Sequence, residues 1–153
     1  MSPSFRIYSS SAGSGKTYQL TKEYLLLALG ADDPAYFKRI LAITFTNDAA
    51  GEMKERIVGA LRRFAYPETG KVDGLLVEVA AELGASGKLP PHAQTAEEQQ
   101  REVQRRAAET FRLVLYHYAD FAVSTIDSFV QRIVTAFTRE LGLPATFEVE
   151  LYR

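Results

Sequence analysis

Hydrophobic positions along the chain alternate three times between short apolar runs and a spacing of three or four residues. Short apolar runs are typical of strands, and the wider spacing is typical of amphipathic helices. The strand-like stretches are 5–9, 39–45 and 121–124, and the helical stripes after them lie in 16–29, 50–64 and 126–141. Because strands and helices alternate, the pattern predicts an α/β fold built on parallel strands.

The stretch 39–45 is apolar at nearly every position, which favours a strand buried on both faces of a parallel sheet. Thr46 and Asn47 follow it as candidate helix caps. Three amphipathic helices are then predicted from their stripes. The stripe residues are Leu20, Tyr24, Leu27 and Ala28 in the first helix, Ala50, Met53, Ile57, Leu61 and Phe64 in the second, and Ile126, Phe129, Ile133, Phe137 and Leu141 in the last.

The section from about 66 to 120 interrupts this alternation. It predicts a helix at 75–83, a loop at 84–91 and a long helix after Thr95, where Glu98 completes a capping-box pattern. We interpret this section as a helical insertion between two strands of one sheet. The inward stripe of its long helix is predicted to be Val103, Ala107, Phe111, Val114 and Tyr118, with Arg101, Arg105, Arg106 and Arg112 standing off that stripe.

Composition narrows the possible chemistry. A chain of 153 residues that is 46% hydrophobic can bury one core and forms one domain by default. The formal net charge of −1 excludes a globally basic nucleic-acid binder, so any nucleic-acid contact must come from a local patch. With no cysteine and two histidines, neither thiolate nor zinc chemistry is expected. Without an apolar run of about 20 residues or a signal core, a cytoplasmic protein with no membrane partner is expected.

Residues 11–17 stand between a predicted strand and a predicted helix and form a candidate phosphate loop. Small residues let successive backbone N–H groups curl around phosphate oxygens at the positive end of a helix. Lys16 is expected to reach the β- and γ-phosphates of ATP, and the Thr17 hydroxyl is expected to bind Mg²⁺. The usual loop opens with Gly where this chain has Ser10. The small residues of the loop are Ser11, Ala12, Gly13, Ser14 and Gly15.

Small polar clusters follow the other two predicted strands, at 44–47 and 124–128. Ligands bind at the carboxyl ends of such strands in open α/β sheets. On residue type alone, helix capping by Thr46-Asn47 and by Ser124-Thr125 is the favoured explanation of these clusters. The residues themselves therefore leave both interpretations open.

Residues 40–57, Ile-Leu-Ala-Ile-Thr-Phe-Thr-Asn-Asp-Ala-Ala-Gly-Glu-Met-Lys-Glu-Arg-Ile, strongly resemble the second conserved motif of UvrD/Rep-type superfamily 1 DNA helicases. Residues 11–17 look like the first motif, in which a non-Gly opening residue is usual. Residues 123–129, Val-Ser-Thr-Ile-Asp-Ser-Phe, resemble the third segment of the RecB and AddA branch, with Asp127 in place of the usual His. The long stretch between the second and third motifs also looks more like RecB or AddA than UvrD or Rep.

The resemblance implies a partial RecA-like P-loop sandwich that binds ATP and Mg²⁺ and holds single-stranded DNA across the top of the sheet. Carried over residue by residue, Phe45 offers a face for base stacking, and Thr46 and Asn47 contact the DNA backbone. Thr125 and Ser128 are implied to do likewise. Asp127 fits poorly there because an acid repels phosphate, whereas an acid is favourable in the first turn of a helix.

Hydrolysis needs an apolar strand that ends in Asp-Glu, to hold magnesium and to activate water, and no such pair occurs here. Residues 114–120 end in an acid but have helical spacing, and 147–151 alternate like a surface strand. There is also no Gln before the phosphate loop to read adenine. No catalytic residue is therefore assigned, and we expect the chain to bind ATP without hydrolysing it.

We interpret residues 1–153 as the N-terminal fragment of the first motor domain of an ATP-dependent DNA helicase. The resemblance implies a helicase/exonuclease subunit of double-strand-break repair and recombination that acts on single-stranded or duplex-end DNA. It also implies that partners include the polypeptide beyond Arg153 and a second helicase-nuclease subunit, and missing strands predict self-association. The alternatives are a stand-alone P-loop nucleotide-binding module and an unrelated P-loop ATPase or kinase, which leaves 44–53 unexplained.

Overall fold

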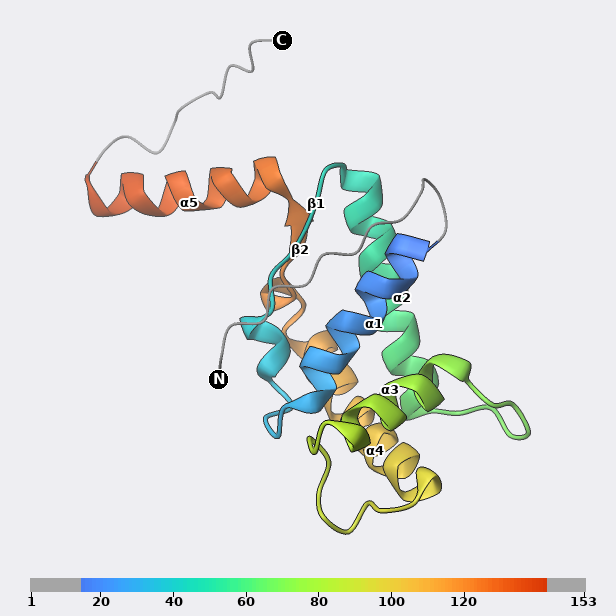
Figure 1. Cartoon of the computed structure of the whole chain (residues 1–153). Coiled ribbons are helices and arrows are strands. Elements are labelled where there is room, and N and C mark those ends of the chain that lie inside the picture. Colours follow the sequence, from blue (N-terminus) through green and yellow to red (C-terminus); the bar gives the residue numbers. More distant parts are fainter. Residues whose placement is uncertain (1–14, 143–153) are drawn as a thin grey trace.

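The structure, a computed structural model, describes residues 15–142 as helices around a small sheet (Figure 1). The strand expected at 5–9, Ser11 to Ser14 of the phosphate loop and the stretch 147–151 lie outside the described residues. No helix in the described part is long and apolar enough to cross a bilayer. The elements are α1 (Gly15–Gly30), η1 (Tyr36–Arg39), β1 (Ala42–Thr44), α2 (Asn47–Ala65), α3 (Gly74–Ala85), α4 (Ala96–Tyr116), η2 (Tyr118–Asp120), β2 (Val123–Thr125) and α5 (Ile126–Glu140), where η marks a 3-10 helix.

The two strands lie side by side and run in the same direction, with Ala42 opposite Val123 and Thr44 opposite Thr125. A parallel pair needs a long crossover, and here α2, α3 and α4 provide it. The expectation of parallel strands separated by helices is thus confirmed for this pair. The sheet has two strands within residues 15–142, so the larger P-loop sandwich stays a prediction.

The prediction that the strand at 39–45 is buried on both faces is wrong for the described residues. Ile43 is 42% exposed and Phe45 is 88% exposed. Neighbouring strand residues point to opposite faces. Ala42 packs against the core, whereas Ile43 points to the other face, which the described elements leave partly open.

Helix α2 forms as its sequence predicts. Thr46 caps it, accepting a hydrogen bond from the Ala49 backbone N–H at 3.2 Å, and Glu52 pairs with Arg56 one turn later. A side-chain oxygen at this position satisfies one of the unpaired donors of the first turn. All five expected stripe residues are buried, namely Ala50, Met53, Ile57, Leu61 and Phe64.

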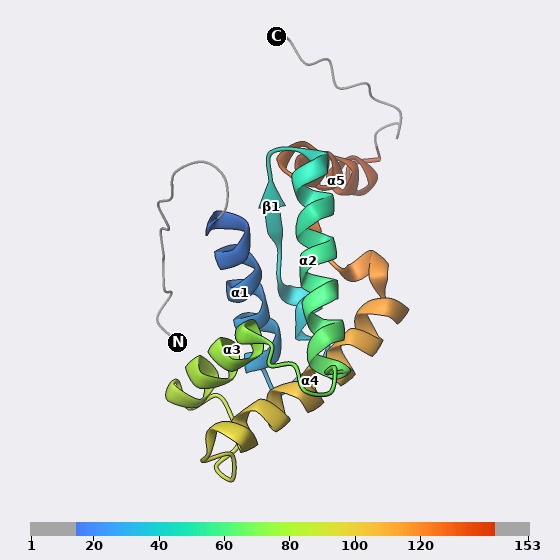
Figure 2. The ribbon, with the colours of Figure 1, turned by 90° about the vertical axis from the view of Figure 1, so that its right-hand side faces the viewer.

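Helices α3 and α4 occupy the stretch expected to be a helical insertion, at the opposite end of the molecule from the start of α2 (Figures 1 and 2). The Thr95–Glu98 capping box is present at the start of α4. Val103, Ala107 and Val114 are buried as expected, and Phe111 is partly buried. Tyr118 is a correction, because α4 ends at Tyr116 and the Tyr118 ring is half-exposed in η2.

Arg106 is a second correction, since it does not stand off the apolar stripe but is buried. Its guanidinium donates to the carbonyl oxygens of Leu29 at 3.0 Å and Ala31 at 3.3 Å, and pairs with Asp32 and Glu102. The end of a helix leaves carbonyl groups without partners. Arg106 satisfies such groups at the end of α1, and this need outweighs the preference of a charge for solvent.

The buried face of α1 also differs from the expected stripe. Tyr24 and Ala28 are buried as expected, but Leu20 and Leu27 are each 47% exposed. Leu25 and Leu29 are fully buried in their place, beside Phe37 and the helices of the insertion. Every residue from Tyr24 to Leu29 is apolar, so the spacing of apolar residues in this half of the helix does not distinguish the side that meets the core.

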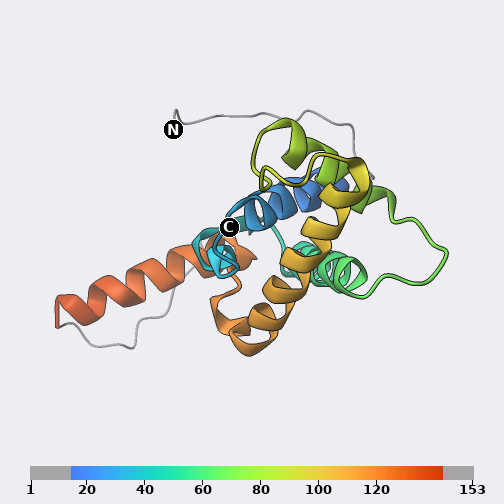
Figure 3. The same ribbon diagram turned by 90° about the horizontal axis from the view of Figure 1, so that it is seen from below.

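Helix α5 begins and ends as predicted, but its apolar stripe does not face a core. It projects away from the other helices (Figures 1 and 3), and none of its residues is buried. Ile133 is 39% exposed and Phe137 is 58% exposed. A helix this amphipathic normally buries its apolar stripe, so the described residues leave the face of α5 without a covering layer.

Candidate nucleotide and DNA interface

The carboxyl ends of the two strands meet at one end of the molecule. Because Thr44 lies opposite Thr125, the polar residues that follow each strand are neighbours in space. Helices α1 and α2 begin at this same end (Figures 1 and 2). The motifs that are far apart in the sequence therefore contribute to one surface, as expected for ligand binding at the carboxyl ends of parallel strands.

Phe45 and Thr46 form the exposed tip after β1. The Phe45 side chain is 88% exposed, and no ring contact holds it within residues 15–142. Thr46 is exposed as well, yet its hydroxyl already accepts from Ala49 and its carbonyl accepts from the Thr44 hydroxyl at 3.0 Å. Asn47 is the exposed first residue of α2. The tip thus presents a free aromatic face beside polar groups.

Thr125 caps α5 from a buried position. Its hydroxyl accepts from the Ser128 backbone N–H at 3.2 Å and donates to the Ser128 hydroxyl at 2.9 Å, and the residue is 5% exposed. Ser128 is partly exposed, and Asp127 lies in the first turn of α5. The capping alternative is therefore correct for Thr46 and Thr125. Thr125 is 5% exposed and therefore offers less surface to DNA than the exposed Thr46, and a DNA contact by either residue stays a prediction.

The described part of the phosphate loop is its last portion, Gly15, Lys16 and Thr17, which form the first turn of α1. Gly15 and Lys16 are exposed, and Lys16 has no ion pair within the described ranges. The Thr17 carbonyl accepts from the Thr21 hydroxyl at 2.7 Å. A free lysine at the start of a helix provides the positive charge and backbone donors that a phosphate requires.

Residues 114–120 show no strand that carries an acidic pair. They run from α4 through η2, as their helical spacing predicts, and Asp120 pairs with Lys38 at 3.0 Å. Between Gly15 and Gly142, no group of three His, Cys, Asp or Glu side chains is placed to hold a metal ion. The Thr17 hydroxyl as a ligand of Mg²⁺ therefore stays a prediction.

A polar contact between α1 and α3 is not evident from the sequence. The Tyr18 hydroxyl donates to Glu78 at 3.0 Å, and the Lys22 ammonium contacts Glu78 at 3.1 Å and Glu82 at 3.3 Å. The hydrogen bonds from Lys22 and Tyr18 hold the pKa of the Glu78 carboxyl below its ordinary value. Tyr18 with Lys22 and Glu78 with Glu82 are each four residues apart, a spacing that places each pair on one helix face.

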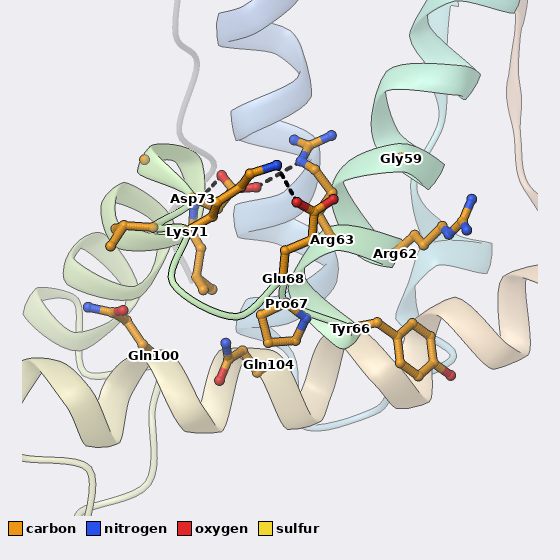
Figure 4. Close-up of a pocket in the computed structure, with 13 residues that line it drawn as sticks. Gly59, Arg62, Arg63, Tyr66, Pro67, Glu68, Lys71, Asp73, Gln100 and Gln104 are labelled. Atoms are coloured by element: carbon orange, nitrogen blue, oxygen red, sulfur yellow. Dashed lines mark hydrogen bonds and ion pairs between the residues drawn. The ribbon is translucent and has the colours of Figure 1, made fainter.

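A hollow of about 940 Å³ lies between the end of α2, the loop before α3 and α4. Its charged residues largely neutralise one another, as Figure 4 shows: Arg63 pairs with Asp73 at 2.8 Å and Lys71 pairs with Glu68, while the Arg62 side chain points away. The hollow lies at the opposite end of α2 from Thr46. It is therefore separate from the interface at the strand ends.

Comparison with known proteins identifies the family. The UvrD/REP helicase N-terminal domain matches residues 5–151. The A subunits of ATP-dependent helicase/nucleases are similar over shorter segments: 47% identical over 55 residues in Alkaliphilus metalliredigens (strain QYMF), 42% over 64 in Alkaliphilus oremlandii (strain OhILAs) and 39% over 64 in Bacillus cereus (strain AH820). These matches cover 36% to 42% of this chain but 4% to 5% of the relatives' length. No solved structure matches.

The motif-based resemblance and the family match agree, and the relatives confirm the RecB/AddA branch that the third motif and the long helical stretch indicate. The match begins before the phosphate loop and continues past α5, so all three motif blocks fall inside it. The chain belongs to the UvrD/REP helicase N-terminal domain family.

Proposed function

We propose that this chain binds ATP with Mg²⁺ through residues 11–17 and contacts single-stranded DNA at the carboxyl ends of β1 and β2. The observation that carries the proposal is the register that sets Thr44 opposite Thr125, beside the start of α1. The proposed nucleotide and DNA sites are neighbours on one sheet. Hydrolysis or release of the nucleotide can therefore change how the neighbouring residues contact DNA. Residues that break the nucleotide are not assigned within this chain.

For the whole protein we propose an ATP-dependent DNA helicase with exonuclease activity that works in double-strand-break repair and recombination in the cytoplasm. The support is the family match together with the names of the relatives, which are helicase/nuclease A subunits. Single-stranded or duplex-end DNA is then its substrate, and a second helicase-nuclease subunit is its partner. An unrelated P-loop kinase fits the phosphate loop but not the segment around Phe45.

The nucleotide site is tested by Lys16→Ala in the purified 153-residue chain. The lysine is expected to neutralise the β- and γ-phosphates, so its loss weakens binding of a fluorescent ATP analogue with Mg²⁺ at least about tenfold, which corresponds to about 1.4 kcal/mol. Lys54→Ala on α2 serves as the control because it removes an equal charge elsewhere. Equal affinity of wild type and Lys16→Ala contradicts the proposed binding. Nucleotide turnover that depends on Lys16 contradicts the separate expectation that the chain does not hydrolyse ATP.

The DNA site is tested by Phe45→Ala. Stacking of a base on an aromatic ring contributes about 1–3 kcal/mol, so the affinity for an oligothymidine measured by fluorescence anisotropy at fixed salt should fall about fivefold or more. Tyr116→Ala removes another exposed aromatic ring, 79% exposed on α4, and should leave the affinity unchanged. If both variants lose affinity equally, or neither does, β1 does not end in a stacking platform.

A further inference from the structure

The helical insertion holds both ends of α1, the helix whose first turn carries Gly15, Lys16 and Thr17. At the far end, Arg106 of α4 donates to the Leu29 and Ala31 carbonyls and pairs with Asp32. At the near end, Glu78 of α3 accepts from Tyr18 and contacts Lys22. The contacts therefore lie on either side of the helix midpoint and resist both sliding and tilting of α1.

The near end of α1 depends on its contact with Glu78 more than the far end depends on its contact with Arg106. None of the first six residues of α1, 15–20, is buried, whereas Thr21 and most residues after Tyr24 are. In the region that the structure describes, the Tyr18–Glu78 hydrogen bond is the side-chain hydrogen bond that joins these six residues to another element. Tyr18 directly follows Thr17, so the contact acts one residue from the expected phosphate and magnesium ligands.

Glu78 is well placed to act as a fixed point. Helix α3 is anchored by its own buried residues, including Leu76, Val79 and Leu83. One Glu78 carboxylate oxygen accepts from Tyr18 at 3.0 Å while the other contacts Lys22 at 3.1 Å. The Lys22 side chain is 17% exposed and also contacts Glu82. Hydrogen bonds that involve an ionised group are about twice as strong as neutral ones, so two such contacts restrain the turn.

We infer that the insertion sets the affinity of the site for ATP by fixing the first turn of α1, and that Glu78 is the positioning residue through which it does so. This inference rests on the proposed ATP binding at residues 11–17. Phosphate binding requires backbone N–H donors and the lysine to stand within hydrogen-bond distance of the oxygens. Displacement of the helix end by a fraction of an ångström weakens every one of these contacts together.

The test measures affinity of the 153-residue chain for a fluorescent ATP analogue with Mg²⁺. Glu78→Ala and Tyr18→Phe are expected to raise the Kd about three- to tenfold, and the double variant is expected to be no worse than Glu78→Ala alone. Such non-additivity indicates that the two residues act through one contact. Glu55→Ala, an exposed glutamate on α2, is the matched control and should leave the Kd unchanged.

A second variant separates positioning from folding. Val79→Ala removes buried methyl groups from the same helix and should lower the melting temperature while leaving the Kd unchanged. An unchanged Kd in Glu78→Ala, with Lys16-dependent binding in the wild type, overturns this inference alone. A Kd that rises equally in Val79→Ala also overturns it, because the effect is then one of stability. Absence of Lys16-dependent binding in the wild type overturns the proposed function as well.

Discussion

At the scale of single residues, the largest departure from expectation is the pair Glu102 and Arg106. Both charged side chains are 8% exposed, in a helix where charge is expected to point outward. The partners of Arg106 are carbonyl oxygens 75 and 77 positions earlier in the sequence. No pattern within α4 reveals that another helix ends against it. Buried charges of this kind are predictable only once the packing is known.

Glu102 should make the stability of the fold depend on acid pH. Hydrogen bonds from Arg105 and then Arg106 lower the pKa of its carboxyl to about 2, from an ordinary 4.5. The carboxylate therefore contributes stability that is fully present above about pH 4.5 and is lost as the pH falls toward 2. The contribution is about 3 kcal/mol at most.

Urea unfolding of wild type and Glu102→Gln at pH 7, 5, 4 and 3 measures this contribution. The difference in unfolding free energy between the two proteins should shrink as the pH falls below about 4.5, because Glu102 of the unfolded chain then binds a proton whereas the folded carboxyl stays ionised down to about pH 2. Glu55→Gln provides the comparison for a glutamate exposed on α2. A gap between wild type and Glu102→Gln that stays constant from pH 7 to pH 3 shows that Glu102 does not carry the effect.

At the scale of elements, helix starts are predictable from the sequence and helix faces only partly so. Thr46, Thr95 and Thr125 all cap helices where the sequence places a hydroxyl before an amphipathic stretch. A cap is a local pattern of four residues, so the sequence contains all of it. Which face is buried depends on neighbouring elements. The predicted stripe of α2 is the buried face because helices and strands surround it. The predicted stripe of α5 has the right spacing, but no residue of α5 is buried by the described elements.

In the candidate site, too, some features are predictable from the local sequence and others depend on tertiary packing. The sequence motifs located the two loops, and the strand register brings the loops together. The burial of Thr125 and the contact of Tyr18 with Glu78 were not predictable, because each depends on elements that are distant in sequence. The local motifs thus predicted which residues gather at the strand ends, while tertiary packing determines which of their hydroxyl and charged groups are exposed.

Thr46 serves as the cap of α2 and is also a proposed DNA contact, and substitutions separate the two roles. Thr46→Ala removes the acceptor for Ala49 and should lower the unfolding free energy by about 1 kcal/mol. Thr46→Asp keeps a capping oxygen and adds a favourable charge at the start of the helix, so stability should be retained. The added charge should repel phosphate and weaken DNA binding severalfold at low salt.

Denaturant unfolding and fluorescence anisotropy on the same three proteins check this. Thr95→Ala, which removes the corresponding cap of α4, is the control: it should lower stability similarly and leave DNA affinity unchanged. If Thr46→Asp binds oligothymidine as tightly as wild type at low ionic strength, Thr46 lies away from the DNA backbone.

At the scale of the whole molecule, the described residues form a well-packed helical body and a poorly covered extension. The core joins α1, α2, α3 and α4, with Ile57, Phe64 and Leu83 among its buried residues. Beyond it, Ile43 of β1 and the apolar residues of α5 remain exposed. Monomeric soluble proteins rarely expose contiguous apolar surface of this kind. The purified chain should therefore associate with itself as its concentration rises.

Light scattering after size exclusion at several protein concentrations measures the association. Val130 and Phe137 are 49% and 58% exposed on α5, so Val130→Glu with Phe137→Glu should shift the chain toward monomer without loss of helical content, since neither side chain contributes to the core. Val72→Glu is the control, because that residue is 82% exposed in the loop before α3 and the substitution adds a negative charge away from α5. If the wild-type chain stays monomeric at every concentration, the apolar stripe of α5 is tolerated in water. If the double substitution leaves the association unchanged, the chains associate through another surface.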